Sequence, residues 1–219
     1  MEIGLAIFGS LAVLTIVLAI IYFSWRYEKK RTEQIRLFAE QIGIPFFPKT
    51  DSAEVSQLPN LELFTQGRSR QVLNLLRGET RSVQLSLFDY QYVTGSGKNA
   101  TTHKTTALLI RSPSLMLPRF TLKPENFFHR IGTFFGLKDI NFEEHPEFSR
   151  KYLLKGKNEE AVRALFVPSR LEFFEGTNGT YVEGDGDQLV FCRPGERVDP
   201  DKLRSFLEEG FAIYSQLSG

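Results

Sequence analysis

The stretch SVQLSLFDYQYVTGSGKNATTHKTTALLIRS, residues 82–112, decides the expected fold. Its first part, 82–93, alternates two sets of side chains, one mainly aliphatic and the other becoming aromatic, and period-two alternation indicates a β-strand. A polar loop at 94–104 leads into a second strand-like run at 104–112. No crossover helix fits between the runs, so they predict a hairpin in an antiparallel sheet. The alternating sets are Val83, Leu85, Leu87, Asp89, Gln91 and Val93, and Ser82, Gln84, Ser86, Phe88, Tyr90 and Tyr92.

Strand-like and helix-like runs extend outward from this hairpin. Upstream, LELFTQG at 61–67 and QVLNLLRG at 71–78 are typical of strands, and LPRFTLKPE at 117–125 is a further strand downstream. Before them, residues 44–60 carry three prolines and predict a connection with a helical turn. The C-terminal third predicts strands at 150–156, 179–184 and 187–193 and helices at 158–175 and 199–217. The whole pattern indicates an α+β domain with an antiparallel sheet and flanking helices.

Composition limits the classes of function. The 219 residues suffice for one domain with an appendage, and the net charge of +1 offers no bulk attraction for nucleic acid. Aromatic residues make up 13% of the chain, enough for a folded core. A single cysteine, Cys192, excludes an internal disulfide framework and zinc sites built on several cysteines.

Residues 3–25, IGLAIFGSLAVLTIVLAIIYFSW, predict a transmembrane helix. No charged residue lies between Glu2 and Arg26. As a helix the segment is about 35 Å long, enough to cross a hydrocarbon core of about 30 Å. Tyr22 and Trp25 stand at its end, where such rings favour the membrane interface. A cleaved signal peptide is disfavoured because the apolar run is too long and no small-residue cleavage site follows.

The flanking charges predict orientation. Arg26, Lys29, Lys30 and Arg31 follow the apolar run, and no basic residue precedes it. Because positive charge prefers the cytoplasmic side, we expect a single-pass protein of the bacterial inner membrane with its N-terminus outside and its domain in the cytoplasm. Ala6 and Ser10 have a spacing that lets helices approach closely, so homo-oligomerisation stays open.

Three units follow from this reading: a transmembrane anchor at 1–25, a juxtamembrane amphipathic helix at 26–43 and a cytoplasmic α+β domain at 44–219. The apolar residues of 27–42 recur at helical spacing, and Gly43 can end the helix. A second Phe-rich helical face, Phe127 to Phe135, is expected to pack in the core, with contact to lipid as the alternative.

The segment NFEEHPEFSRKYLLKG, 141–156, raises the question of a metal or acid–base site. Glu143, Glu144, His145 and Glu147 lie close in sequence, but Pro146 disfavours a regular helix through His145. A metal site needs three or four ligands held by fixed elements, and no second histidine is near. We therefore expect a polar structural joint.

Three other motifs also favour a structural interpretation. The loop at 94–104 contains Gly-Ser-Gly-Lys but lacks the spacing and the following helix of a phosphate loop, so it is expected to be an exposed hairpin tip. Cys192 has apolar neighbours and is expected to be a packed thiol. EGDGD at 183–187 starts like a calcium loop but lacks flanking helices, and Asp185-Gly186 is expected to form a hairpin turn.

Two motifs carry a resemblance. One is the Phe-Asp-Tyr strand at Phe88, Asp89 and Tyr90; the other is the run PEF…Y…G…EA…LF.P from Pro146 to Pro168. Over about residues 60–195 the chain resembles uncharacterised bacterial membrane-anchored proteins that carry a domain of unknown function. The resemblance implies a fold and a membrane setting, and it brings no catalytic residue.

These observations predict a membrane-tethered cytoplasmic interaction module with no catalytic, cofactor or metal site. Its expected partners are the bilayer, through residues 3–25, and an unidentified protein, with no nucleic acid. The alternative is a lipid- or small-ligand-binding module at the membrane surface. A third hypothesis is an enzyme that uses Glu143, His145, Glu147 or Asp89, the last with a raised pKa if it is buried.

Overall fold

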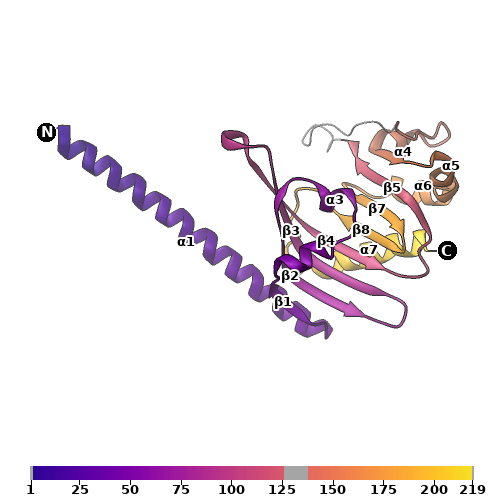
Figure 1. The fold of residues 1–219 in the computed structure, drawn as a ribbon, viewed down its shortest axis with the longest axis horizontal. Helices are drawn as coiled ribbons and strands as arrows, with labels where there is room; N and C mark the ends of the chain where they lie inside the picture. The colour runs from indigo at the N-terminus through magenta and orange to yellow at the C-terminus, as the bar shows by residue number, and fades with distance from the viewer. Residues whose placement is uncertain (1, 126–137, 219) are drawn as a thin grey trace.

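The structure, a computed structural model, describes residues 2–125 and 138–218, with the side chains of all of these except 2–13 and 52. It begins with α1 (Glu2–Ile42), one helix of 41 residues. Figure 1 shows the first half of α1 projecting from the domain as a rod and its last turns lying against the sheet. Gly43, with φ +70°, allows the chain to leave the helix, as the sequence predicted.

The two halves of α1 differ in what covers them. Near its C-terminal end Ile35, Phe38 and Ala39 are buried in the core. Between Leu14 and Trp25 the large apolar side chains are exposed. In the part of the chain that the structure describes, no helix combines the length and the apolar character needed to cross a membrane.

The domain is built on one eight-stranded sheet in which every neighbouring pair is antiparallel. The predicted α+β class with an antiparallel sheet and flanking helices is confirmed. Its strand order is β1-β2-β3-β4-β8-β7-β5-β6. The strands are β1 (Phe46–Lys49), β2 (Arg68–Glu79), β3 (Gln84–Thr94), β4 (Thr101–Arg111), β5 (Leu117–Pro124), β6 (Tyr152–Gly156), β7 (Tyr181–Gly186) and β8 (Gln188–Cys192).

The predicted hairpin is the centre of this sheet. β3 and β4 pair along their full length, from Gln84 opposite Arg111 to Thr94 opposite Thr101. Alternation along β3 separates two faces. Leu85, Leu87 and Asp89 face one way, and Phe88 and Tyr90 belong to the cluster on the other face.

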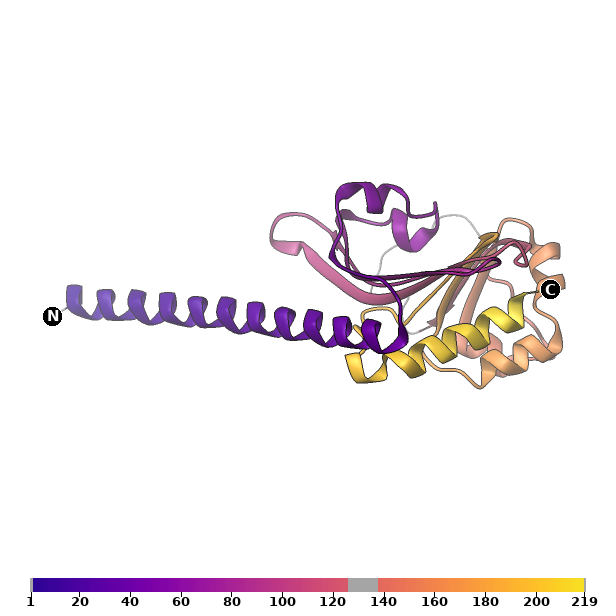
Figure 2. The same cartoon turned by 90° about the horizontal axis from the view of Figure 1, so that it is seen from below.

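Different elements cover the two faces. Figure 2 shows the end of α1 and the long helix α7 (Leu203–Leu217) on one side of the sheet, and α2 (Ser52–Ser56) and α3 (Glu62–Thr65) on the other. The aromatic cluster of β3 therefore packs against Leu61, Leu63 and Phe64 of the short helical segment.

One sequence expectation for the N-terminal part of the domain was wrong, and a second was incomplete. LELFTQG at 61–67 is not a strand, because residues Glu62–Thr65 form α3, whose apolar side chains cap the aromatic face. The proline-containing connection after α1 holds the predicted helical turn, as α2, but also an unpredicted strand, β1, in which Pro48 is tolerated because β1 is an edge strand.

The C-terminal part agrees more closely with the sequence. Pro168 begins a new helix, so the predicted segment 158–175 is two helices, α5 (Glu159–Leu165) and α6 (Pro168–Glu175). The turn between β7 and β8 contains Gly186 with φ +59°, as expected of the Asp-Gly pair. Residues Pro146–Lys151 form the short helix α4 before β6, so the predicted strand at 150–156 begins two residues later.

Candidate functional site

A buried ion pair joins α1 to the sheet. Arg31, 2% exposed, donates from Nε to Asp89 Oδ2 at 2.8 Å and from Nη2 to Asp89 Oδ1 at 2.7 Å. This two-point geometry is the strongest arrangement available to an arginine and a carboxylate. In the sequence, Arg31 is the last of the four basic residues that follow the apolar run, and these residues predict the orientation of the helix. In the structure its guanidinium also fixes the helix on β3.

Neighbouring groups satisfy the remaining hydrogen-bond donors and acceptors of Arg31 and Asp89. Thr106 of β4 donates its hydroxyl to Asp89 Oδ1 at 3.0 Å, and Asn74 of β2 donates its amide to Asp89 Oδ2 at 2.9 Å. Arg31 Nη1 donates to the backbone oxygen of Val198 at 2.8 Å. Asn74 has φ +51°, beside a register shift in the β2–β3 pairing that brings its side chain to Asp89.

A second, less buried ion pair lies beside the Arg31–Asp89 pair. Arg197 donates to both carboxylate oxygens of Glu28, at 2.7 and 2.8 Å, and to Asp89 at 3.1 Å. Lys104 of β4 lies 3.3 Å from Glu28. We call Glu28, Arg31, Asp89 and Arg197 the helix clamp. It joins α1, β3 and the segment before α7, three elements far apart in sequence.

The clamp keeps Asp89 ionised. Burial alone would raise the pKa of this carboxyl, but the hydrogen bonds and charge of Arg31, together with Arg197 and Asn74, lower it below its ordinary value. The enzyme hypothesis invoked a raised pKa at this position. The environment lowers it, so Asp89 does not hold a proton for acid catalysis near neutral pH.

A second buried carboxyl lies on the opposite face of the sheet. Glu183 of β7 is fully buried, and burial raises its pKa to about 8. Tyr181 donates its hydroxyl to Glu183 Oε1 at 2.6 Å, and the backbone N–H of Leu63 lies 3.4 Å from Oε2. The sequence placed Glu183 in a candidate calcium loop; it instead lies inside the domain beneath α3.

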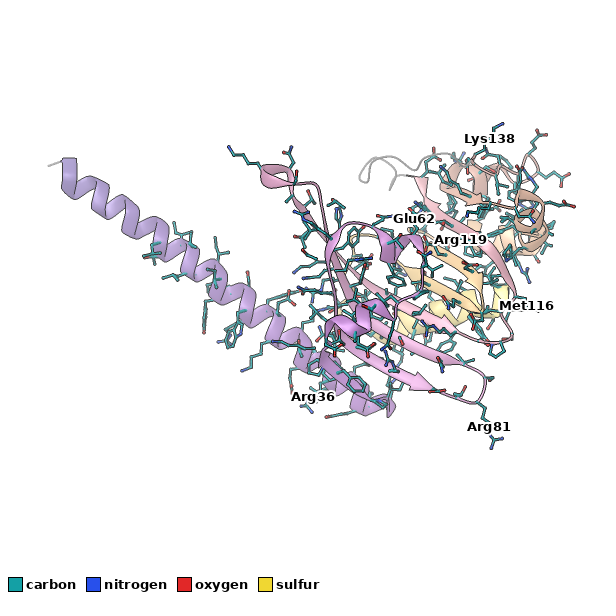
Figure 3. All side chains as sticks on the ribbon, in the orientation of Figure 1. Arg36, Glu62, Arg81, Met116, Arg119 and Lys138 are labelled. Carbon is teal, nitrogen blue, oxygen red and sulfur yellow. The ribbon has the colours of Figure 1, made fainter. Side chains whose placement is uncertain are left out.

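A second ionisable pair lies close to Glu183. Glu62 of α3 and Lys123 of β5 form an ion pair with side chains that are 11% and 12% exposed. Burial raises the pKa of Glu62 and lowers that of Lys123, so each neutral form is favoured relative to water. Burial here favours a structural role in seating α3, whose position Figure 3 marks through Glu62.

A groove opens on the same face, between α2 and strands β2 to β4. Its volume is about 250 Å³. Leu58, Val72, Phe88 and Leu109 are among the apolar residues that line it. Arg111 also lines it, and its Nε is buried without a hydrogen-bond partner among the described residues. Most of the remaining lining is polar or charged and includes Glu54, Arg77 and Glu79, so the groove is more polar than the mainly apolar pockets typical of small-ligand sites.

The acidic segment at 143–147 is a joint. His145 precedes α4, and its Nδ1 lies 3.2 Å from Glu175 Oε1 at the end of α6. Glu175 also accepts a hydrogen bond from the backbone N–H of Phe148. Glu147 pairs with Arg150 at the surface. These contacts tie α4 to α6, and they do not converge on a common ligand position.

The remaining sequence candidates are dispersed. Cys192 is completely buried, and burial raises the pKa of its thiol. His103 stacks on Tyr92 and bonds Thr94. Within residues 2–125 and 138–218, no group of three or more His, Cys, Asp or Glu side chains could hold a metal ion. The Phe127–Phe135 face and the pair Ala6 and Ser10 lie outside the residues or side chains that the structure describes.

Comparisons with known proteins bear on the fold. No family model matches this chain, and no curated protein matches its sequence. A crystal structure of the mycobacterial trehalose monomycolate transport factor A superimposes with a TM-score of 0.60, covering 85% of this chain and 91% of that chain at 10% identity. The two chains share a fold. At this identity the likeness does not extend to function.

Proposed function

We propose that this chain is a non-enzymatic module, tethered to a membrane by the first half of α1, that recruits or organises a protein partner at the bilayer surface. The observation that carries the proposal is the division of α1. One half is locked into the core by the helix clamp, and the other exposes a continuous apolar surface.

The exposed half needs an apolar environment. Leu14, Ile16, Leu18, Ile20 and Phe23 are each more than half exposed on all sides of the helix. Contiguous apolar surface of this kind marks a membrane or protein contact. Residues 3–25 hold no charge, and a bilayer surrounds a helix on every side, so we assign the hydrocarbon core as the occupant.

The end of the apolar run has the chemistry of a membrane interface. Arg26 lies over the ring of Tyr22, and Lys29 lies 5.2 Å from the ring centroid of Trp25. Aromatic rings paired with cations favour the headgroup region. The basic residues that follow favour a cytoplasmic domain with the N-terminus outside.

The structural neighbour supports the fold alone, and only its name offers a hypothesis for the kind of process. Its name describes a transport factor for trehalose monomycolate. We propose that this chain acts in a transport-associated process at a membrane. The lowered pKa of Asp89 removes one of the acids that the enzyme hypothesis invoked.

The first test is membrane retention of the full chain. Leu14→Arg combined with Leu18→Arg would place two charges in the apolar run, each costing about 3 kcal/mol at the centre of a bilayer. We expect the parent protein to stay with membranes after alkaline carbonate extraction and this variant to be released. Leu14→Val combined with Leu18→Val is the matched control and should be retained. Release of the parent protein would refute the anchor.

The second test identifies the partner. Photo-crosslinking of the full chain in native membranes should capture one reproducible protein, and the arginine variant should lose it while keeping its thermal unfolding midpoint. Capture by both forms would mean that the tether does not organise the interaction. Labelling of Ser82→Cys from outside intact cells by an impermeant thiol reagent would overturn the proposed orientation.

A second candidate function is small-ligand binding in the groove beside α2. The observation that favours it is the Nε of Arg111, which is buried in the lining of the groove without a hydrogen-bond partner among the described residues. Native mass spectrometry of the full chain should then show a retained small molecule. Leu109→Phe, which would narrow the groove, should displace the molecule. Identical spectra without added mass would leave only the tethering function.

A further inference from the structure

The tip of the β3–β4 hairpin and the start of the docked half of α1 lie at the same end of the molecule. Figures 1 and 2 both show the hairpin pointing in the direction of the free half of α1. From this arrangement, and resting on the proposed membrane anchor, we infer that the hairpin tip, residues 95–100, contacts the anionic headgroups of the membrane that holds α1.

Contacts along α1 and β4 set the level of the tip. Arg31 lies against Thr106, and Glu28, one turn toward the N-terminus of α1, lies against Lys104. Moving toward the start of α1 therefore moves toward the tip along β4. From Lys104 to Thr101 the strand rises about 10 Å. An equal distance along α1 from Glu28 reaches about Tyr22, the end of the apolar run.

The clamp makes this alignment rigid. Arg197 and Lys104 both hold Glu28, and β3 and β4 stay paired as far as Thr94 and Thr101. A helix that crosses the bilayer therefore brings the tip to the height of the headgroups, whatever its lateral distance from α1. The tip reaches this height without a movement of the sheet relative to α1.

The charge of this end is complementary to an anionic surface. The segments 26–30, 67–70 and 94–104 contain seven Lys or Arg residues and one carboxylate, Glu28. The rest of the chain then holds 20 basic and 25 acidic residues, so the positive charge is concentrated where the membrane would lie. Arg68 supports the tip directly, donating to the backbone oxygen of Gly95 at 2.7 Å.

The composition of the tip limits how deep it goes. Residues 95–100, Gly-Ser-Gly-Lys-Asn-Ala, contain no large apolar side chain that could enter the hydrocarbon, and Lys98 is exposed. The occupant is therefore the phosphate layer of an anionic lipid surface. Each basic residue near such a surface favours contact by about fivefold.

Depth-resolved fluorescence quenching tests the inference on the full chain. Asn99→Cys would carry a fluorophore at the tip, and Ser82→Cys would carry it at the opposite end of β3; buried Cys192 should not react. In vesicles of phosphatidylcholine and phosphatidylglycerol, headgroup nitroxides should quench the label at 99 and spare that at 82. Nitroxides deep in the acyl chains should quench neither label.

Charge substitutions separate contact from proximity. Arg68→Gln with Lys98→Gln should lower the contacting fraction by about fivefold per charge, and high salt should do the same. Arg81→Gln with Lys138→Gln is the matched control, because Figure 3 places both residues away from the free half of α1. Equal quenching at 99 and 82 in carbonate-resistant protein would refute the hairpin contact and leave the anchor intact.

Two further outcomes would also overturn the inference. Failure of carbonate retention would remove the anchor on which it rests. A response of the label at 99 to an added oligonucleotide, with none to anionic vesicles, would assign the basic end to nucleic acid instead.

Discussion

At the scale of single residues, two buried carboxyls on opposite faces of the sheet have pKa values that are shifted in opposite directions. Asp89 is ionised within a network of donors, whereas Glu183 is buried with its pKa raised to about 8. The difference comes from partners. Arg31 and Arg197 compensate Asp89, while Glu183 has a neighbouring carboxyl in Glu62 and a phenol in Tyr181.

Arg31→Met should be strongly destabilising. It leaves Asp89 buried with part of its compensation gone, and breaking a buried pair on one side costs about 3 kcal/mol or more. Chemical denaturation at neutral pH measures the loss. Arg36→Met is the matched control on the same helix, because the ion pairs of Arg36 are with exposed Glu33 and Glu40, and its loss should cost less than about 1 kcal/mol. Equal losses would contradict the clamp.

Glu183→Gln should flatten the pH dependence of stability. The folded pKa of Glu183 lies above the unfolded value, so the folded state binds more protons between those pH values. This carboxyl therefore favours folding fully below its unfolded pKa, and that contribution is lost as the pH rises through about 8. Glutamine can still accept the hydrogen bond of Tyr181 but does not titrate.

Thermal unfolding midpoints between pH 5 and pH 9 would check this. The difference between the variant and the parent should grow in favour of the variant as the pH rises. Glu147→Gln, at an exposed position of α4, is the control and should follow the parent. A constant difference across this range would show that Glu183 is already ionised in the folded protein.

At the scale of elements, α7 depends on a close approach to the sheet. Gly210 lies where a Cβ would stand 2.2 Å from Leu108 Cδ2 and 3.2 Å from Phe191 Cδ1. The glycine weakens the helix by about 1 kcal/mol relative to alanine. Packing against β4 and β8 offsets that cost, since Leu203, Phe206 and Ile213 of the same helix are buried.

Gly210→Ala should therefore destabilise the domain by about 1–3 kcal/mol, against the propensity of the helix. Denaturant titration measures the change, and Leu108→Val in the same chain should recover part of it by removing the colliding methyl. Glu208→Ala, at an exposed position of α7, should be neutral or slightly stabilising. Stabilisation by Gly210→Ala alone would mean that the helix does not pack this closely.

At the scale of the whole molecule, the clamp decides how the domain sits relative to α1. In Asp89→Asn we expect faster amide hydrogen exchange along residues 28–42, because the docked half of α1 loses its fixed contact. Strands β7 and β8 lie further along the sheet and should keep the protection of the parent. Mass spectrometry of peptides from the full chain in detergent measures both. A uniform rise across all peptides would indicate global destabilisation instead of release of the helix.

The sequence by itself determined the elements with strong local signals. Alternation in 82–93 predicted β3, the Asp-Gly pair predicted the β7–β8 turn, and helical spacing predicted the buried stripe of α1 that includes Ile35 and Phe38. Each depends on neighbours two to four residues apart, so the local pattern suffices. LELFTQG misled because a four-residue helix is too short for its period to be distinguished from alternation.

Only the tertiary structure decided the candidate site. Arg31 and Asp89 are 58 residues apart, and Arg197 is 108 residues from Asp89. In the sequence Arg31 belongs to a basic run and Asp89 to a strand. The fold brings them together because α1 lies across β3 and the segment before α7 closes over both. A buried charge is stable only beside its compensating partners, and which residues those are depends on the topology of the sheet.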